Sequence, residues 1–113
     1  MRFVVLLYQE ESVWAEASPQ EQERLYAEHD AFAAAVTDRG CSLLAGEALT
    51  TVSTATTVRR RGDRLSVTEG PFAETTEQLG GFYLVDAPDL DVLTDLVRLL
   101  PEYTVEIRPV AEM

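Results

Sequence analysis

Two short segments of the chain, residues 2–8 and 80–85, carry large apolar side chains at both odd and even positions. Successive residues of a strand point to opposite faces of a sheet, so each segment would be apolar on both faces. This pattern is typical of strands in the middle of a sheet that is covered on both sides. We therefore expect these two segments to lie at the centre of one sheet.

Two other segments have the three- and four-residue spacing of an amphipathic helix. The first is predicted over residues 18–39, where Ser18 and Glu21 form a capping box at its start. The second is predicted over residues 88–101, with a proline near each end. Their apolar stripes are Leu25, His29, Phe32 and Val36 in the first helix, and Leu90, Leu93, Val97 and Leu100 in the second.

The remaining segments complete a single fold. Strands are predicted at residues 43–49 and 104–109, and a hairpin at residues 54–60 and 65–68 with its turn at Gly62-Asp63. The order is strand, helix, strand, inserted hairpin, strand, helix, strand. Without the hairpin this is the ferredoxin-like βαββαβ arrangement, an α+β fold whose first and third core strands are central.

The arrangement leaves one face of the sheet without cover, because both helices lie on the other face. A bare apolar face needs a partner. We therefore expect a homodimer in which two copies pack sheet against sheet through the open sheet face. A chain of 113 residues has room for one domain, spanning residues 1–113.

The net charge of the chain limits the kinds of partner that it can bind. Nine basic and twenty acidic residues give a net charge of -11, which opposes approach to nucleic acid or to an anionic membrane surface. The single cysteine, Cys41, cannot form an internal disulfide, so we expect a cytoplasmic protein. The apolar run at the N-terminus is too short to span a bilayer.

His29 is the only histidine and lies on the apolar stripe of the first helix, between Leu25 and Phe32. An imidazole with its ordinary pKa of about 6.5 can act as an acid or a base at neutral pH. The alternative is a core histidine that is hydrogen-bonded to a backbone carbonyl, since buried polar groups need partners.

The loop at residues 69–78 is the second candidate for chemistry. Its polar and aromatic side chains of interest are Glu69, Phe72, Glu74, Glu77 and Gln78. The carboxylates could hold a metal or move protons, and the alternative is a solvated loop that satisfies its own backbone. One histidine and one cysteine do not make a typical zinc site, and we expect neither a metal nor a cofactor.

Two further features lie outside that loop. Trp14 and Tyr26 are candidates to line a pocket or the dimer interface. Arg59–Arg61 and Arg64 concentrate four of the nine basic residues on the hairpin. Such a cluster could bind an anionic ligand or the acidic surface of a partner, or it could be solvated and discourage edge-to-edge pairing of strands.

The stretch from Glu69 to Asp86, EGPFAETTEQLGGFYLVD, resembles the signature of the YCII-related proteins called the DGPF or DGPFAETKE family. The resemblance extends over nearly the whole chain, from the opening strand to the closing one. It implies a ferredoxin-like protomer in a dimeric α/β barrel, the architecture expected above. Glu69 stands where the family has aspartate, and Thr76 stands where it usually has lysine.

The resemblance also bears on function. Related proteins are proposed to use a histidine of the first helix with an aspartate after the second helix. His29 matches that histidine, but Glu102 is the nearest acidic residue to the second position and is shifted from it. Some family members accompany extracytoplasmic-function sigma factors, which implies a regulatory setting.

Two functions follow as alternatives, beside a third interpretation in which the fold serves mainly for dimerisation. In the first, the chain is a small cofactor-free enzyme with His29, Glu69 and Glu74 as catalytic residues, His29 being the general acid or base. Its ligand would contact Trp14, Phe72, Glu77 and Gln78. In the second, the chain is a non-catalytic module that binds a small ligand or a protein partner in a sigma-factor system.

Overall fold

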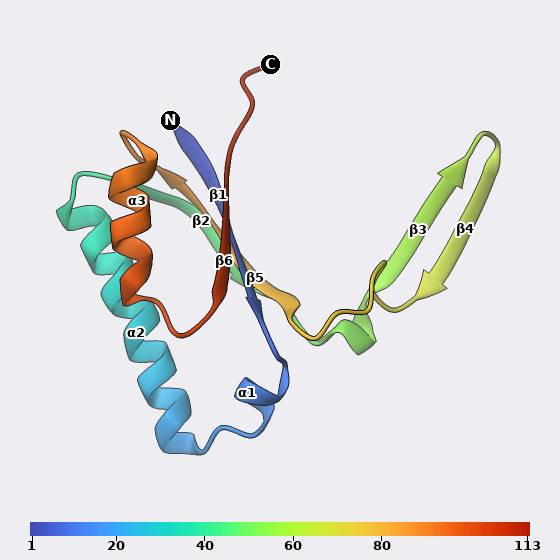
Figure 1. The fold of residues 1–113 in the computed structure, drawn as a ribbon, viewed down its shortest axis with the longest axis horizontal. Helices are drawn as coiled ribbons and strands as arrows, with labels where there is room; N and C mark the ends of the chain where they lie inside the picture. The colour runs from blue at the N-terminus through green and yellow to red at the C-terminus, as the bar shows by residue number, and fades with distance from the viewer.

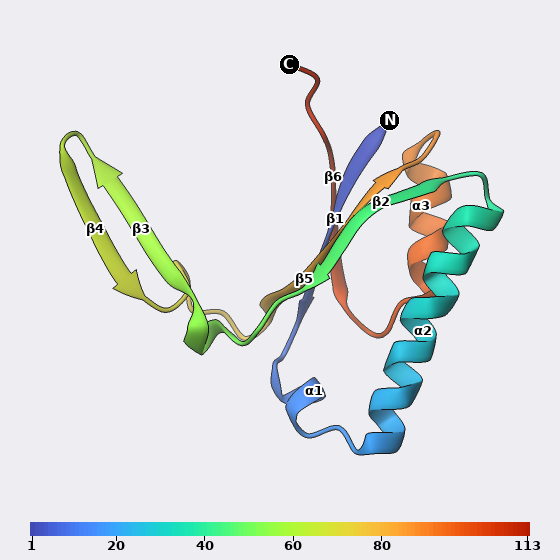
Figure 2. The same cartoon turned by 180° about the vertical axis from the view of Figure 1, so that it is seen from behind.

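The computed structural model describes residues 1–113 as a four-stranded antiparallel sheet, two helices on one of its faces, and a hairpin that stands apart (Figures 1 and 2). The sheet consists of β1 (Arg2–Gln9), β2 (Ser42–Ala48), β5 (Gln78–Asp86) and β6 (Thr104–Pro109). Their order is β2-β5-β1-β6, so the first and third core strands are central, as predicted. The fold is the α+β ferredoxin-like arrangement.

The helices begin and end at local signals in the sequence. The long helix α2 (Pro19–Asp38) starts after Ser18, whose hydroxyl accepts a hydrogen bond from a backbone N–H of the first turn at 3.1 Å. It ends before Gly40, whose φ of 75° is a conformation that glycine adopts readily. The helix α3 (Leu90–Leu96) starts after Asp89, whose carboxylate also accepts a backbone hydrogen bond of the first turn.

The second helix is shorter than predicted. After Leu96 the chain tightens into the 3₁₀ turn η2 (Val97–Leu99) and does not continue as an α-helix to Pro101. Of the predicted stripe, Leu93 and Leu100 are buried and Val97 packs against the core. Leu90, at the first residue of the helix, is half exposed, and Leu96 is buried although it was not part of that stripe. No helix of the structure has the length and apolar character needed to cross a membrane.

The two faces of the sheet differ in cover. On β1, Phe3, Val5 and Leu7 point toward the helices and are buried in the core. The register places Val4 opposite Leu84 and Leu6 opposite Phe82 on the other face. These four partly exposed side chains form what we call the open face: Val4, Leu6, Phe82 and Leu84. Within one chain, only the helix-bearing face of the sheet is covered.

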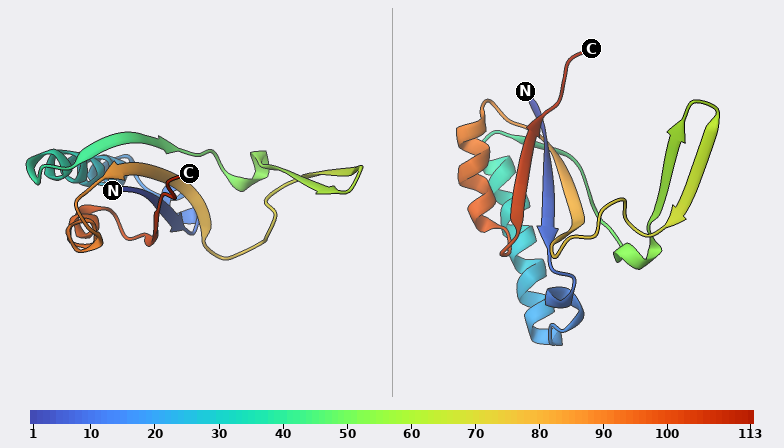
Figure 3. Two further views of the ribbon diagram at one scale, coloured as in Figure 1. Left: turned by 90° about the horizontal axis from the view of Figure 1, so that it is seen from above. Right: turned by 45° about the vertical axis from the view of Figure 1, so that its right-hand side comes forward.

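The hairpin forms a sheet of its own. β3 (Thr56–Arg61) and β4 (Arg64–Glu69) pair only with each other and are joined by the predicted turn at Gly62-Asp63. We call residues 56–72 the arm and the rest of the chain the body. Figure 3 shows the arm reaching away from the body, in a molecule that measures 48 × 43 × 18 Å.

The base of the arm is held by hydrogen bonds to backbone carbonyls near its two connections. The N–H of Gly70 donates to the carbonyl of Ala55 at 2.7 Å, and the hydroxyl of Thr57 donates to the carbonyl of Gly70 at 2.8 Å. The guanidinium of Arg59 donates to the carbonyl of Phe72 at 3.2 Å. These contacts order the base locally, but they do not connect the arm to the sheet or helices of the body.

Candidate functional site

His29 lies between two tyrosine hydroxyls. Its Nδ1 is 2.6 Å from the hydroxyl oxygen of Tyr83, and its Nε2 is 2.8 Å from that of Tyr103. The three side chains come from α2, from β5 and from the segment that leads into β6. The apolar stripe of α2 thus turns His29 toward the sheet, where hydroxyls rather than a backbone carbonyl satisfy both ring nitrogens. We call these three residues the Tyr-His-Tyr cluster.

Close packing fixes the ring of Tyr83. Its centroid lies 5.0 Å from that of Phe32 in the core. The ring also lies against Gly46 of β2, where a Cβ atom would stand 2.5 Å from Cδ1 of Tyr83. Only glycine permits so close an approach of an aromatic ring to the strand. A fixed Tyr83 in turn fixes the orientation of the His29 imidazole.

Burial sets the protonation states of the cluster. It lowers the pKa of His29, while the nearby carboxylates of Glu28 and Asp30 act in the opposite direction. Burial raises the pKa of both Tyr83 and Tyr103. At neutral pH the imidazole is therefore neutral and both phenols keep their protons. Because a neutral imidazole has one donor and one acceptor nitrogen, one tyrosine donates to it and the other accepts from it.

The cluster borders a cleft of about 310 Å³. His29 and Tyr103 line this cleft, together with the rings of Trp14 and Tyr26, which meet edge to face with centroids 5.3 Å apart. Trp14 belongs to the short helix α1 (Ser12–Ala15). The other lining residues are Gln9, Glu10, Glu11, Leu25, Ala48, Leu49, Thr51, Gln78 and Gly80. An adjoining hollow of about 260 Å³ shares His29 and Tyr103 and extends to Tyr83.

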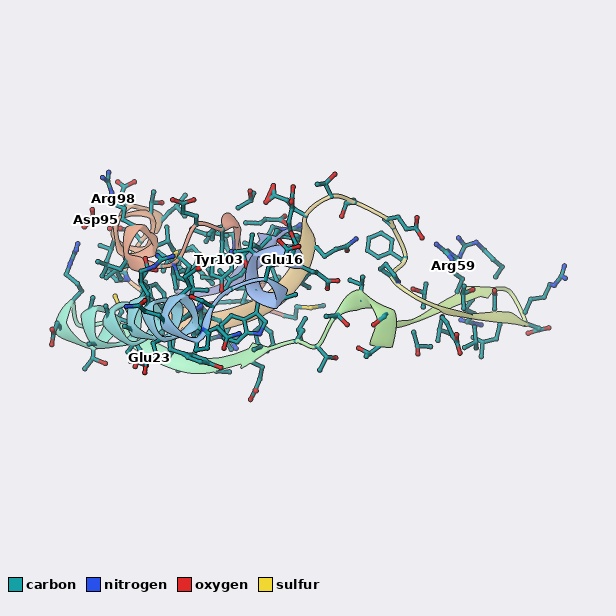
Figure 4. All side chains as sticks on the ribbon, turned by 90° about the horizontal axis from the view of Figure 1, so that it is seen from below. Glu16, Glu23, Arg59, Asp95, Arg98 and Tyr103 are labelled. Carbon is teal, nitrogen blue, oxygen red and sulfur yellow. The ribbon has the colours of Figure 1, made fainter.

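The charge of the cleft is one-sided. Glu10 and Glu11 are its acidic residues, and neither arginine nor lysine lines it. Glu11 also accepts a hydrogen bond from the backbone N–H of Val52 at 2.9 Å, which holds its carboxylate near the cleft. The arginines of the arm do not reach this region: Figure 4 shows Arg59 on the arm and Tyr103 in the body, far apart.

The candidates named from the sequence separate into two places. Trp14 and Gln78 line the cleft with His29. Glu69 and Phe72 lie on the arm, Glu74 lies in the exposed loop that follows it, and none of these three lines the cleft.

Glu77 and Gln78 are adjacent in sequence but differ in what they contact. The carboxylate of Glu77 accepts hydrogen bonds from the hydroxyl of Thr104 at 2.8 and 3.0 Å, at the start of β6. Gln78 lies at the cleft and donates to the backbone carbonyl of Thr75. His29 has no carboxylate among its hydrogen-bond partners, so within one chain the tyrosines occupy the place expected for a glutamate.

The two tyrosines are the site residues that the sequence did not reveal. Tyr83 was expected only to fill one face of a central strand, and Tyr103 had no predicted role. A signal was present, because a histidine on a buried stripe needs partners for two nitrogens. Tyrosine is a side chain that can lie in an apolar layer and still offer a hydroxyl.

The fold and the site together define a small α+β protein in which a histidine lies between two tyrosines at the wall of a cleft lined by aromatic side chains. A sequence model of the YCII-related domain matches residues 1–113, the whole chain. An uncharacterised protein of Rhizobium meliloti (strain 1021) is 36% identical over 116 residues, which cover 98% of this chain and 93% of that protein. The chain therefore belongs to the YCII-related family, which confirms the family resemblance. The structure brings together no group of three or more histidine, cysteine, aspartate or glutamate side chains able to hold a metal ion.

Proposed function

We propose that the cleft binds a small organic molecule and that the Tyr-His-Tyr cluster moves a proton to or from it, in a reaction that requires no cofactor. The observation that carries this proposal is the imidazole of His29, hydrogen-bonded to a tyrosine hydroxyl on both sides and placed at the cleft wall beside Tyr103. An imidazole that burial keeps neutral has one ring lone pair to accept a proton, so it is suited to act as a base at neutral pH.

The proton would pass through Tyr103. In one tautomer the phenol of Tyr103 donates to Nε2 of His29, while the N–H at Nδ1 donates to the oxygen of Tyr83. Tyr103 then takes a proton from the ligand as its own proton passes to Nε2, which produces an imidazolium beside Tyr83. The reverse transfer restores the neutral ring. The step balances without a further reactant, because the cluster only stores and returns a proton.

The lining favours a ligand that is uncharged or cationic. Two carboxylates, Glu10 and Glu11, stand at the cleft, and no arginine or lysine is there to oppose them. Desolvation also keeps His29 from supplying a positive charge at neutral pH. The rings of Trp14 and Tyr26 add a flat apolar wall, so the best ligand has an aromatic or similarly flat part.

We propose further that the working unit is a homodimer that packs through the open face. Val4 and Leu6 of β1 and Phe82 and Leu84 of β5 form a contiguous apolar patch at the centre of the sheet. Such a patch on the bare side of a sheet is stabilised when a second layer covers it. The sheet of a second copy can supply this layer, so no other protein is needed to cover the patch.

A non-catalytic binding module is the second candidate, and one observation favours it. Both nitrogens of His29 are already occupied by protein hydroxyls, so the imidazole can be a fixed wall of a binding cleft. In this alternative the module would sense a ligand within a regulatory system, such as one that contains a sigma factor.

Fluorescence of Trp14, the only tryptophan, provides the test of binding. We expect benzyl alcohol and benzylammonium to change the emission in a saturable way, and benzoate to bind at least about tenfold more weakly, a difference of about 1.4 kcal/mol. The control is Tyr103→Phe, which keeps the ring but removes the hydroxyl. If none of the three probes binds, the proposed cleft function is wrong.

Proton transfer is tested with phenylacetone, an uncharged aromatic ketone with acidic C–H bonds. In D₂O, NMR should show protein-dependent exchange of its protons for deuterium, and both His29→Gln and Tyr103→Phe should abolish that exchange. Binding without exchange would favour the non-catalytic module over the enzyme.

A further inference from the structure

The arm has two chemically different faces. Directly opposed residues of an antiparallel pair share a face, and the register pairs Val58 with Val67 and Arg60 with Leu65. Since alternate residues of a strand share a face, Val58, Leu65 and Val67 lie on one side together with Arg60, and this side ends in the Thr56–Glu69 pair at the base of the arm. The opposite side carries Arg59 and Arg61 of β3, and Arg64, Ser66 and Thr68 of β4.

The apolar side of the arm is open to solvent. Val58, Leu65 and Val67 are 55%, 64% and 63% exposed, and no strand or helix of the body covers them. A hairpin of two strands is marginally stable by itself in water, and it gains stability when a third layer covers its apolar side. Val58 and Val67 therefore lie outside the core of the chain and are open to a covering layer.

The charge of the arm indicates which surface would cover it. Residues 56–72 contain four of the nine basic residues and two of the twenty acidic ones, so the arm has a net charge of +2 and the body one of -13. A basic ribbon is attracted to a strongly acidic surface. The body of a second copy provides such a surface at every encounter between two chains.

We propose that the arm packs its apolar side against the body of a second copy of the chain, so that each copy holds the other. This inference rests on the homodimer proposed above and extends it: the open face supplies one part of the interface and the two arms supply the other. A two-fold axis makes the exchange reciprocal, since the same arm and the same body surface occur on both copies.

Photo-crosslinking tests where the arm lies. p-Benzoylphenylalanine is introduced at position 65, and ¹⁵N-labelled and unlabelled copies of this variant are mixed and irradiated. We expect crosslinked peptides of mixed isotope content that join the arm to the body. Crosslinks only within single copies, or none, in a protein that sedimentation shows to be dimeric would overturn the arm proposal and leave the sheet dimer standing. A monomer at every concentration would overturn both.

Matched substitutions on β4 measure how much the arm contributes to the free energy of dimerisation. Val67→Ser should weaken dimerisation at least about tenfold, whereas Thr68→Ser, the next residue on the opposite face, should leave the dissociation constant within about twofold. Val67→Thr keeps a β-branched side chain and strand propensity, so a similar weakening with this variant shows that the arm has not simply unfolded. Equal dissociation constants for all four proteins would contradict the proposal.

Discussion

The body and the arm are both built on antiparallel strands with an apolar side, but only the body covers one of its apolar sides within the chain. Phe32 of α2 is fully buried between the helix and the sheet, whereas Phe72 of the arm is 79% exposed. The strands of both regions contain valine and leucine, so residue type alone does not explain the difference. What differs is the presence of an amphipathic helix over the strands.

The difference agrees with the separate tasks proposed above for the two regions. In the body, burial holds the imidazole of His29 between two hydroxyls and gives the cleft a fixed wall. In the arm, local hydrogen bonds and the turn at Gly62 set the shape, and the apolar side remains available to a partner. Chemistry requires the first kind of order, and association between copies is served by the second.

We expect the largest difference in stability between alanine substitutions of two phenylalanines, one in the body and one in the arm. Phe32→Ala should lower the free energy of unfolding by about 3–5 kcal/mol, because it removes a fully buried ring and leaves a cavity. Phe72→Ala should change the stability by less than about 0.5 kcal/mol, as is usual for exposed positions. Urea unfolding at one fixed, low protein concentration measures both. Similar losses for the two variants would show that the arm is buried within its own chain.

Two glycines sharpen the comparison at the level of the backbone. Gly46→Ala should cost about 1–3 kcal/mol in the body, because the new methyl group meets the Tyr83 ring and overpacks the site. Gly80→Ala is the control, since a Cβ atom there makes only an ordinary contact at 4.0 Å. An unchanged stability of the Gly46→Ala protein would mean that the ring of Tyr83 is free to move.

In the arm, glycine is required by conformation and not by space. Gly62 has a φ of 61° and nothing lies within 4 Å of a Cβ atom built there. Gly62→Ala should therefore cost about 1 kcal/mol through its left-handed backbone, and Gly62→Asn should cost less. Hydrogen exchange should report this loss in the amides of the arm alone. Faster exchange in the sheet of the body would show that arm and body unfold together.

The sequence contained most of the fold because its signals were local. The apolar residues at both odd and even positions of the segments at 2–8 and 80–85, and the Ser18 cap, each depend on a few neighbouring residues. The end of α3 was less accessible, since an α-helical spacing and a closing 3₁₀ turn differ only slightly in pattern. No local pattern in the sequence indicated that the hairpin would stand apart from the sheet.

The site was harder to predict because its contacts are long-range. His29 was identifiable as a rare titratable residue on an apolar stripe, but its partners lie 54 and 74 residues further along the chain. The glutamates near the arm were candidates because several lie close together in the sequence, but the number of carboxylates does not determine where their side chains lie in the fold. Only the register of β5 beside β2 and the approach of β6 bring the two tyrosines to the imidazole.

Mild acid should act on the body alone, because the single histidine of the chain lies there. The pKa of His29 is lowered by burial in the folded state, so below its unfolded value of about 6.5 the unfolded chain binds the proton more readily. The stability associated with the neutral ring is fully present above about pH 6.5 and is lost as the pH falls through the lowered pKa. Urea unfolding of the wild type and of His29→Gln between about pH 8 and pH 5 isolates this contribution.

The carboxylate of Asp30 provides the sharpest control for that pH effect. Because it raises the pKa of His29 against the effect of burial, Asp30→Asn should lower this pKa further and steepen the loss of stability in acid. The contribution of His29 to the acid-induced loss of unfolding free energy is the difference in that loss between a protein and its His29→Gln counterpart. This contribution should be smaller in the wild-type background than in the Asp30→Asn background. If the wild type instead gains stability relative to His29→Gln as the pH falls, the imidazolium is favoured in the folded protein, and His29 belongs to an ion pair rather than to a neutral Tyr-His-Tyr cluster.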